Sequence, residues 1–587
     1  MAPLSFRLLV FDASTKLPSG IFEGNIRDLG MYDQCIKVNA TVGNETIRGK
    51  HCIFSLKGNF NVTTLPIDPI MSVCLPATCS PKQVKEKMQK LFNMAEQFLG
   101  GREIRVNNTI CSEVDAQPWE LGAKVTLGVF VGLVTFLLIC TFCELLPKFT
   151  SINSGLITTL SKFSFIVNGQ RILSTKVSKE NIPGIAGLKV FSMFWIIFVH
   201  AYIHSLSCSM INLGEVESWY YSWRSTHVFV ATYSLDTFLA VTGFLTSYLF
   251  LKEMAKRRKF NVFMYYLHRY IRLTPAYGAL LLFTIYLIPK MSSGALWQPA
   301  FNNQSTSCKQ DWLPMILYGY NFYYVQGMTC LVHTWYLAMD MQLFWVSPFI
   351  LYPLYKKPKL GLIILSAAIV ASVITPATVV MVNKFSTMIS KEQYTDIRMM
   401  LKYYVVPYCR AGPWLLGILT GYLIASGSKP PSSGVRIIGW ILTFLAFTYG
   451  YFTFRIYQQE DYKWNMYWEM FHGIVTKFLS HPIYLPFSRV SYSIYLLHLI
   501  IQSIRVYSMR TPIYFSEYQM IIIIIIDVIT SFLAAIIFSL VFESPFVILE
   551  KLIFSREKPI DRPPEPIQEE ITSENGIINH GFGKQVD

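Results

Sequence analysis

Charge is scarce in this sequence. Only 15% of its 587 residues are charged, whereas 52% are hydrophobic, and the mean hydropathy is +0.37. A soluble chain of this length would divide into several domains and would carry more charge. Instead, apolar stretches of about 20 residues, the length that crosses a bilayer, recur along the chain. The composition therefore excludes an ordinary soluble protein and predicts an all-α polytopic membrane protein.

Motifs for nucleic acid and for metal are missing as well. The formal net charge of +15 comes without a compact basic domain or a nucleic-acid-binding motif. Lys and Arg gather in short loops between the apolar stretches, as the positive-inside rule describes. His200 and His204 have the i, i+4 spacing of zinc ligands, but no third ligand is indicated near them. We therefore expect no nucleic-acid partner and no metal.

The start of the chain lacks the apolar core of a signal peptide, because the apolar run in MAPLSFRLLVFDAS is too short. Residues 1–122 are nevertheless predicted to form a small water-soluble domain on the luminal or extracellular side. A domain of this size rarely crosses a membrane without a signal peptide. We expect either that the natural protein starts upstream of Met1 or that Met1 is an artefact of gene assignment.

Glycosylation sequons and cysteines place this domain outside the cytosol. Sequons act only on a luminal chain, and clustered cysteines favour an oxidising compartment. The domain holds five cysteines, so one stays free or pairs elsewhere, for which Cys208 is a candidate. In the later loop 290–332 we expect a Cys308–Cys330 bond. The disulfide candidates are Cys35, Cys52, Cys74, Cys79, Cys111, Cys208, Cys308 and Cys330, and the sequon asparagines are Asn39, Asn44, Asn61, Asn107 and Asn303.

One helix of this domain is predicted from its ends. Ser80 suits the N-cap, Pro81 the first helical position, and Gln83 completes a capping box. Gly100-Gly101 ends the helix. The apolar residues expected on its buried face are Val84, Met88, Leu91 and Phe98.

Eleven apolar stretches predict about eleven transmembrane helices. They cover about residues 123–146, 186–205, 227–251, 265–289, 333–354, 360–382, 409–426, 436–456, 464–480, 490–508 and 519–543. Basic loops predict the cytosolic side and sequons the luminal side, which gives a luminal N-terminus and a cytosolic C-terminus. Residues 123–185 form the first transmembrane helix and a cytosolic linker, 186–555 the transmembrane core, and 556–587 a disordered cytosolic tail.

Ionisable side chains inside the predicted spans are the candidate functional residues, because they are costly in hydrocarbon and usually serve a pathway or site. Lys189 and His200 are eleven positions apart, which places them on one helix face about 16 Å apart. His333 and Asp340 are seven apart, again on one face. Two interpretations stay open for the first pair. Either Lys189 snorkels to the interface and His200 bonds to a neighbouring helix, or both belong to a site.

Two further groups of polar residues are candidates for a functional role. Arg269 and Arg272 lie one turn apart at the predicted cytosolic end of the fourth span, where they either anchor the helix or clamp a phosphate. Ser491, Tyr495 and His498 follow one another at i, i+4 and i+7. Seven residues separate the Cα atoms of Ser491 and His498 by about 10 Å, which is too far for a direct hydrogen bond. We therefore interpret this group as a packing serine and a buried polar histidine.

Together these stretches resemble a known family. GLKVFSMFWIIFVHAY, LDTFLAVTGFLTSYL, RYIRLTPAY, HTWYLAMDMQLF, PYCRAGPWLLGILTGYL, LSHPIYLPFSRVSYSIYLLHLII and FESP resemble, in this order, the membrane core of acyltransferase family 3. The upstream DASTKLPSGIFEGNIRDLGMYDQC and CLPATCS resemble the luminal domain of its animal branch, the nose-resistant-to-fluoxetine proteins. The resemblance covers about residues 10–555.

The resemblance implies an integral membrane O-acyltransferase. Enzymes of the family move an acyl group from cytosolic acyl-CoA to an acceptor hydroxyl on the far side of the membrane. The family's Arg-then-His signature falls on Lys189 and His200, so Lys here replaces Arg and loses its bidentate fork. His200 matches the catalytic residue and would act as general base on the acceptor hydroxyl.

The remaining family positions extend this expected site. Arg269 and Arg272 match the arginines expected to hold the phosphates of acyl-CoA, together with Lys189. His333 and Asp340 match the HTWYL segment and its acidic position, and join His200 as catalytic candidates.

Three functions stay open at this point. The first is acyl transfer to a lipid or other small-molecule acceptor, with membrane lipid as the surrounding partner. The second is a non-catalytic carrier of lipids and lipophilic compounds on the same fold, which the Lys189 substitution makes conceivable. The third is a receptor in which the luminal domain binds a partner. Plasma membrane and endoplasmic reticulum both suit a glycosylated chain.

Overall fold

A computed structural model of the chain describes residues 4–554 with gaps. The gaps are 17, 43–44, 59–66, 97–102, 113–117, 151–153, 177–182, 207, 258, 323–329, 386–396, 429–431, 436, 440, 442–444, 446–447 and 449–483. Most of the predicted eighth span, the whole ninth span and the predicted tail 556–587 therefore lie outside the described residues. So do Asn44, Asn61 and the predicted helix end at Gly100-Gly101.

The N-terminal domain contains an antiparallel sheet, which the sequence had not predicted. Its strands are β1 (Asn39–Val42), β2 (Glu45–Lys57), β3 (Ile70–Pro76) and β4 (Arg105–Cys111), and β2 pairs with each of the others. Side chains of β2 alternate between two covered faces. Phe54 and Leu56 pack beneath α3 (Pro81–Glu96), whereas Ile53 faces Leu29 on the other side. Helices α1 (Leu4–Ala13) and α2 (Tyr32–Lys37) complete the domain.

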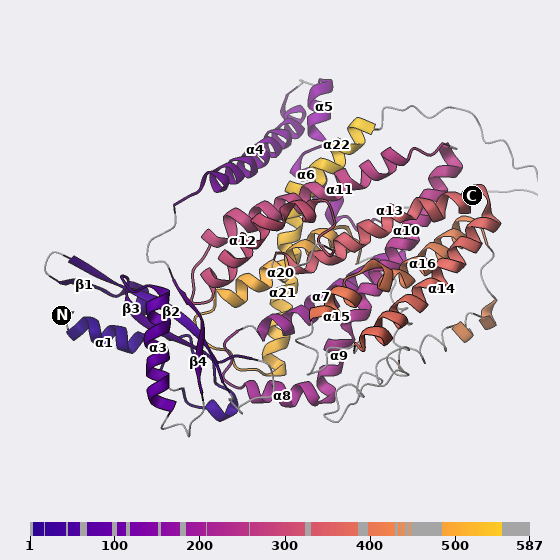
Figure 1. The fold of residues 1–587 in the computed structure, drawn as a ribbon. Helices are drawn as coiled ribbons and strands as arrows, with labels where there is room; N and C mark the ends of the chain where they lie inside the picture. The colour runs from indigo at the N-terminus through magenta and orange to yellow at the C-terminus, as the bar shows by residue number, and fades with distance from the viewer. Residues whose placement is uncertain are drawn as a thin grey trace, which may run out of the picture.

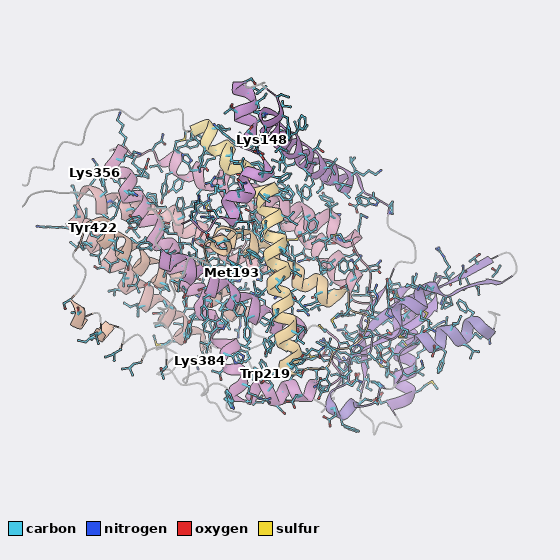
Figure 2. All side chains as sticks on the ribbon, turned by 180° about the vertical axis from the view of Figure 1, so that it is seen from behind. Lys148, Met193, Trp219, Lys356, Lys384 and Tyr422 are labelled. Atoms are coloured by element: carbon cyan, nitrogen blue, oxygen red, sulfur yellow. A yellow bond between two sulfur atoms is a disulfide. The ribbon has the colours of Figure 1, made fainter. Side chains whose placement is uncertain are left out.

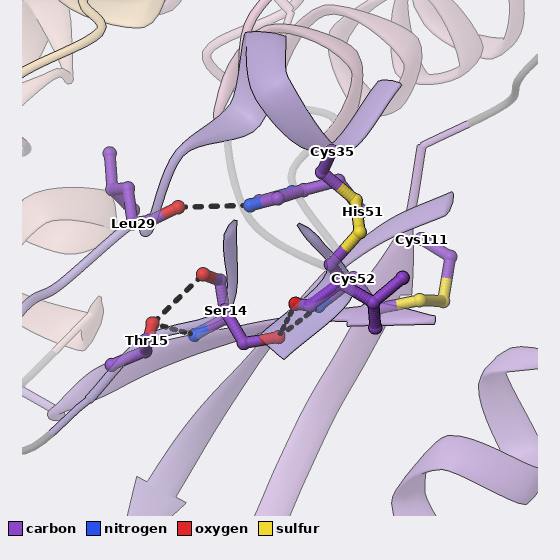
Figure 3. Close-up of a disulfide and its surroundings, with 10 residues drawn as sticks. Ser14, Thr15, Leu29, Cys35, His51, Cys52 and Cys111 are labelled. Carbon is purple, nitrogen blue, oxygen red and sulfur yellow. Dashed lines mark hydrogen bonds between the residues drawn. A yellow bond between two sulfur atoms is a disulfide. The ribbon is translucent and has the colours of Figure 1, made fainter. Parts of the chain in front are cut away.

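Disulfides hold this sheet together. Cys35–Cys74 joins α2 to β3, and Cys52–Cys111 joins β2 to β4 (Figure 3). These bonds close loops of 39 and 59 residues, each worth about 4 kcal/mol in the chain-entropy account. The predicted Cys308–Cys330 bond is confirmed. Cys79 and Cys208 are free thiols, so Cys208 as a partner for the fifth cysteine is wrong.

The predicted start of α3 is confirmed. The Ser80 backbone N–H donates to Oε1 of Gln83 at 3.0 Å, and the Gln83 N–H donates to Oγ of Ser80 at 3.3 Å. Leu91 is wrong as a core residue because its side chain is 56% exposed. Val84 and Met88 are confirmed as buried-face residues, and Phe92, one position after Leu91, packs against the sheet in its place. The predicted Phe98 lies outside the described residues.

The rest of the chain is a helical bundle (Figure 1). Its long helices are α4 (Leu121–Phe149), α7 (Pro183–Ser205), α10 (Tyr233–Arg257), α11 (Val262–Leu282), α13 (Trp335–Lys356), α14 (Pro358–Asn383), α16 (Pro407–Ala425), α20 (Ser491–Tyr507) and α21 (Glu517–Phe538). Seven helical stretches among the described residues are long and apolar enough to cross a membrane. The predicted seventh and tenth spans form α16 and α20, which do not meet that measure, and eleven spans are not confirmed.

Short helices occupy the connections. The predicted cytosolic linker contains α5 (Gly155–Ser161) and α6 (Phe165–Leu173). The predicted loop 290–332 contains the helix α12 (Trp297–Ile316), whose polar composition gave no span signal. Its sequon residue Asn303 is exposed. The other short helices are α8 (Leu213–Tyr221), α9 (Thr226–Phe229), α15 (Ile397–Met399), α19 (Tyr484–Arg489) and α22 (Ser544–Phe554).

The bundle has two distinct ends. At the end that we call the domain end, the sheet domain is bonded to the bundle: Arg510 forms an ion pair with Asp33 at 2.8 Å, and Arg27 donates to the Leu206 carbonyl at 3.4 Å. At the opposite end, which we call the far end, the chain carries Lys148 and Lys356 (Figure 2). Basic residues at the far end agree with the charge pattern from which the cytosolic side was predicted.

Helices α10 and α16 approach one another more closely than any side chain would permit. A Cβ atom on Gly417 would lie 2.1 Å from the Ala240 carbonyl oxygen, and one on Gly243 would lie 2.1 Å from the Trp414 carbonyl oxygen. Small residues at such a crossing let backbones pack together where hydrophobic collapse cannot drive association. This contact therefore fixes the spacing of two helices in the bundle.

We expect Gly417→Ala to lower the Tm of the detergent-solubilised protein, because the methyl group must push the two backbones apart. Overpacking of this kind typically costs about 1–3 kcal/mol. The matched control is Gly128→Ala on α4, where a Cβ would meet nothing within 4 Å. This control should leave Tm unchanged or raise it slightly, since Ala favours a helix by about 1 kcal/mol over Gly. Equal Tm values for the two variants would contradict the close contact.

His51 is buried between the sheet and the bundle-facing side of the domain. Its Nε2 donates to the Leu29 carbonyl at 2.9 Å (Figure 3), and Tyr32 packs edge-on at 5.3 Å between ring centroids. The other ring nitrogen, Nδ1, is buried without a hydrogen bond among the described residues. Burial lowers the pKa of His51 below its ordinary value of 6.5, and the bond to Leu29 opposes this only in part.

We expect the N-terminal domain to lose stability as the pH falls below about 6.5. The unfolded chain then binds a proton at His51 that the folded domain, with its lowered pKa, does not bind, at about 1.4 kcal/mol per unit of pKa difference. His51→Gln, which keeps a donor for Leu29, should remove this loss. The measurement compares proteolysis of residues 4–112 in the two full-length proteins at each pH between 7.5 and 5. Parallel curves would exclude His51 as the cause.

Candidate active site

Helix α7 runs through the middle of the bundle, where Figure 2 shows its residue Met193. His200 stands on this helix five residues before its end and meets His498 of α20. Nδ1 of His200 and Nε2 of His498 are 3.2 Å apart, and the ring centroids are 5.2 Å apart. His200 therefore faces another helix rather than lipid.

A third histidine closes this cluster. His333 lies in the turn η6 (Val332–Thr334) before α13, with its ring centroid 5.4 Å from that of His498. Its Nε2 donates to the Leu496 carbonyl at 3.1 Å, which leaves Nδ1 as a buried acceptor without a partner among the described residues. The Tyr495 hydroxyl donates to the His333 carbonyl. We call His200, His333 and His498 the histidine cluster.

Asp340 pairs with an arginine and not with a histidine. Its Oδ2 accepts a hydrogen bond from Nη2 of Arg269, so the pair joins α13 to α11. The guanidinium also lies over the ring of Phe344, with its central carbon 4.4 Å from the ring centroid. Asp340 Oδ1 and Arg269 Nε are buried without hydrogen bonds among the described residues. The pair therefore keeps one acceptor and one donor unused.

Two cations lie beside this ion pair. Lys189 is in electrostatic range of both Arg272 and Asp340. Within the described part of the chain, neither Lys189 nor Arg272 forms a hydrogen bond or an ion pair. Two cations in electrostatic range repel one another, so an anion bound between them would be stabilised. Arg272 is also in electrostatic range of the buried carboxylate of Glu543. We call Lys189, Arg269 and Arg272 the cation cluster.

Tyrosines connect the two clusters. Tyr336 and Tyr495 have ring centroids 5.8 Å apart, and Tyr495 lies 5.5 Å from His333 by the same measure. The Tyr336 hydroxyl is buried without a hydrogen bond among the described residues and is in electrostatic range of Asp340. A run of polar side chains thus leads from the histidines toward the cations through the apolar core.

The structure places the six site residues predicted from the sequence in these two clusters. His200 and His333 fall in one, while Lys189, Arg269, Arg272 and Asp340 fall in or beside the other. Sequence reasoning missed His498 as a member, because it tested only the partner within the same helix. The hydroxyl of Ser491 donates instead to the Ser488 carbonyl at 2.9 Å.

The zinc alternative has no further support from geometry. Nδ1 of His204 is buried without a hydrogen bond in the described chain. Within the described ranges, no group of three His, Cys, Asp or Glu side chains is arranged to hold a metal ion.

Two family models match the chain. An acyltransferase-domain family matches residues 182–543, and the N-terminal domain of nose resistant-to-fluoxetine proteins matches residues 5–88. The chain belongs to acyltransferase family 3. The family match includes every member of both clusters and ends at Glu543, in the π-turn η8 (Ser539–Glu543). The nose-resistant match covers the sheet domain up to the middle of α3.

Two relatives from Caenorhabditis elegans are similar over long stretches. Nose resistant to fluoxetine protein 6 is 25% identical over 653 aligned positions, covering 94% of this chain and 78% of that protein. Regulator of hypoxia-inducible factor 1 is 21% identical over 309 positions, covering 48% of this chain and 59% of that protein. No solved structure matches the chain described in this structure significantly.

We expect Asp340→Asn to destabilise the protein strongly, because it leaves the Arg269 charge unpaired inside the bundle. Removing one partner of a buried pair typically costs about 3–5 kcal/mol. The control is Asp33→Asn, which breaks the exposed pair with Arg510 and should cost at most about 1 kcal/mol. Thermal unfolding in detergent compares the two. A smaller loss for Asp340→Asn than for Asp33→Asn would show that the buried pair is not formed.

Proposed function

We propose that this family member transfers an acyl group from acyl-CoA to the hydroxyl of a lipid or other small molecule. The observation that carries the proposal is the placement of a cation, Lys189, and an imidazole, His200, on one helix. Lys189 and His200 both belong to α7, and eleven residues of helix separate their Cα atoms by about 16 Å. A donor with a phosphorylated body and a reactive thioester would span such a distance.

The cation cluster suits the phosphates of the donor. Lys189 and Arg272 are unpaired within the described residues, and Arg269 keeps a free N–H. Phosphate oxygens accept charge-assisted hydrogen bonds from such groups. The cluster lies nearer than the histidines to the basic far end, which the positive-inside rule assigns to the cytosol. In this orientation the N-terminal domain is luminal or extracellular, in either the plasma membrane or the endoplasmic reticulum.

The histidine cluster suits the transfer step. Nε2 of His200 takes the proton of the acceptor hydroxyl as its oxygen attacks the thioester carbonyl. The tetrahedral intermediate collapses, the carbon–sulfur bond breaks, and the imidazolium returns the proton to the departing CoA sulfur. The products are an O-acyl ester and free CoA, so no other reactant is needed.

The carrier function competes with this proposal. The observation that favours it is Lys189 itself, which stands where the family has Arg and cannot make the bidentate contact of a guanidinium. Lys nevertheless keeps the positive charge and binds phosphate as a point charge. A carrier would move lipid between membranes or leaflets without consuming acyl-CoA.

We expect the purified protein in liposomes to release CoA from acyl-CoA when a hydroxyl acceptor is present. His200→Ala should lower the rate by about 10²–10⁴-fold, the usual size of a general-base effect. The matched control is His227→Ala, which removes a histidine outside both clusters and should retain the rate. Lipid movement without CoA release, insensitive to His200→Ala, would favour the carrier instead.

A further inference from the structure

His498 has one ring nitrogen committed to the backbone of its own helix. Its Nδ1 lies 2.7 Å from the Tyr495 carbonyl oxygen and 3.3 Å from the Ile494 carbonyl oxygen. Carbonyl oxygens can only accept hydrogen bonds, so the proton of His498 sits on Nδ1. In a neutral ring the second nitrogen, Nε2, is then an acceptor. It points at Nδ1 of His200, 3.2 Å away.

The surroundings keep this ring neutral. His498 is fully buried, and the titratable groups that face it are His200 and His204 of α7, His333 of η6, and Tyr495 of its own helix. None of them is a carboxylate. The nearby carboxylate of Asp340 is bonded to Arg269. A second proton on His498 would place an uncompensated charge in an apolar interior.

We propose that His498 is a positioning residue that fixes the tautomer of His200, holding its proton on Nδ1 and leaving the Nε2 lone pair free. This inference rests on the proposed function, because it names how the general base is prepared. Only a ring with a free lone pair can take a proton from an acceptor hydroxyl. The Ile196 carbonyl, four residues earlier on α7, also accepts a hydrogen bond from the His200 ring.

A second contact fixes the two helices at this point. Gln502, one turn after His498 on α20, donates to the Ile197 carbonyl of α7 at 2.9 Å. Ile197 lies one turn before His200 on α7. The side-chain contact between the histidines is therefore held in register by an independent side-chain-to-backbone bond.

A neutral partner has a different consequence from the carboxylate of a Ser-His-Asp triad. Both hold the tautomer, but only the carboxylate stabilises the imidazolium. With His498 as partner, the protonated His200 is not stabilised and returns its proton readily to the leaving sulfur.

The test replaces His498 with three side chains that differ as acceptors. His498→Leu has no acceptor and should lower kcat by about 10²–10⁴-fold, the range of general-base and tautomer effects, with KM for acyl-CoA unchanged. His498→Gln offers an amide oxygen and should recover most of that loss. His498→Glu offers a charged acceptor, which favours the imidazolium, so the acid limb of the pH–rate profile should move to higher pH.

A packing role alone would not move the pH profile. The proposal is overturned if folded His498→Leu retains the wild-type kcat, or if folded His498→Glu leaves the acid limb in place. Size-exclusion profiles and Tm values establish that each variant is folded. Should His498→Glu not fold, His498→Leu and His498→Gln still decide the matter.

A second measurement does not depend on activity. NMR of the full protein labelled with ¹³C-histidine distinguishes the two tautomers, and His200→Gln identifies the His200 signal. The Nδ1–H tautomer in wild type and its loss in His498→Leu support the positioning role even if no acyl transfer is found, in which case only the proposed function fails. The Nε2–H tautomer in wild type overturns the inference, whether or not the protein is active.

Discussion

An unpaired charge inside a bilayer is costly, and this cost determines where the helices of the bundle meet. Three carboxylates inside the bundle each pair with an arginine from another helix. Asp340 of α13 meets Arg269 of α11, Asp236 of α10 meets Arg410 of α16, and Asp527 of α21 meets Arg505 of α20. Such pairs add little net stability compared with apolar packing, but separating the partners leaves an uncompensated charge inside the bundle. They therefore select one packing among many that hydrocarbon contacts would permit.

The same requirement leaves some polar atoms of the described residues without a hydrogen bond, and several of these lie at the candidate site. Most buried polar groups of a folded protein are hydrogen-bonded, and each exception calls for a reason. Here the exceptions include Nδ1 of His333, Oδ1 of Asp340, Nε of Arg269 and the Tyr336 hydroxyl. All four lie along the run between the histidine cluster and the cation cluster. Binding of a polar ligand along this run would satisfy them.

The sequence predicted individual features well where one physical rule acts alone. The length of the apolar stretches identified most of the long helices, and the capping box identified the start of α3. The free-energy cost of placing an ionisable group in lipid singled out His200 and Asp340. The sheet of the N-terminal domain was missed although β1, β2 and β3 are consecutive in the chain; only β4 pairs with β2 across a long stretch. Helix α12 was missed because its polar face is stabilised by tertiary contacts and by the Cys308–Cys330 bond. The contact of His498 with His200 spans 298 residues, and no spacing rule within one helix reveals it.

The Cys308–Cys330 bond ends three residues before His333. It ties the start of α13 to α12, whose buried residues Trp297 and Phe301 belong to the main core of the bundle. The segment that carries the His333 ring is thus anchored covalently on one side and by α13 on the other. In a compartment that keeps this disulfide oxidised, a covalent bond at the aqueous edge of the protein therefore stabilises the position of His333 in the buried histidine cluster.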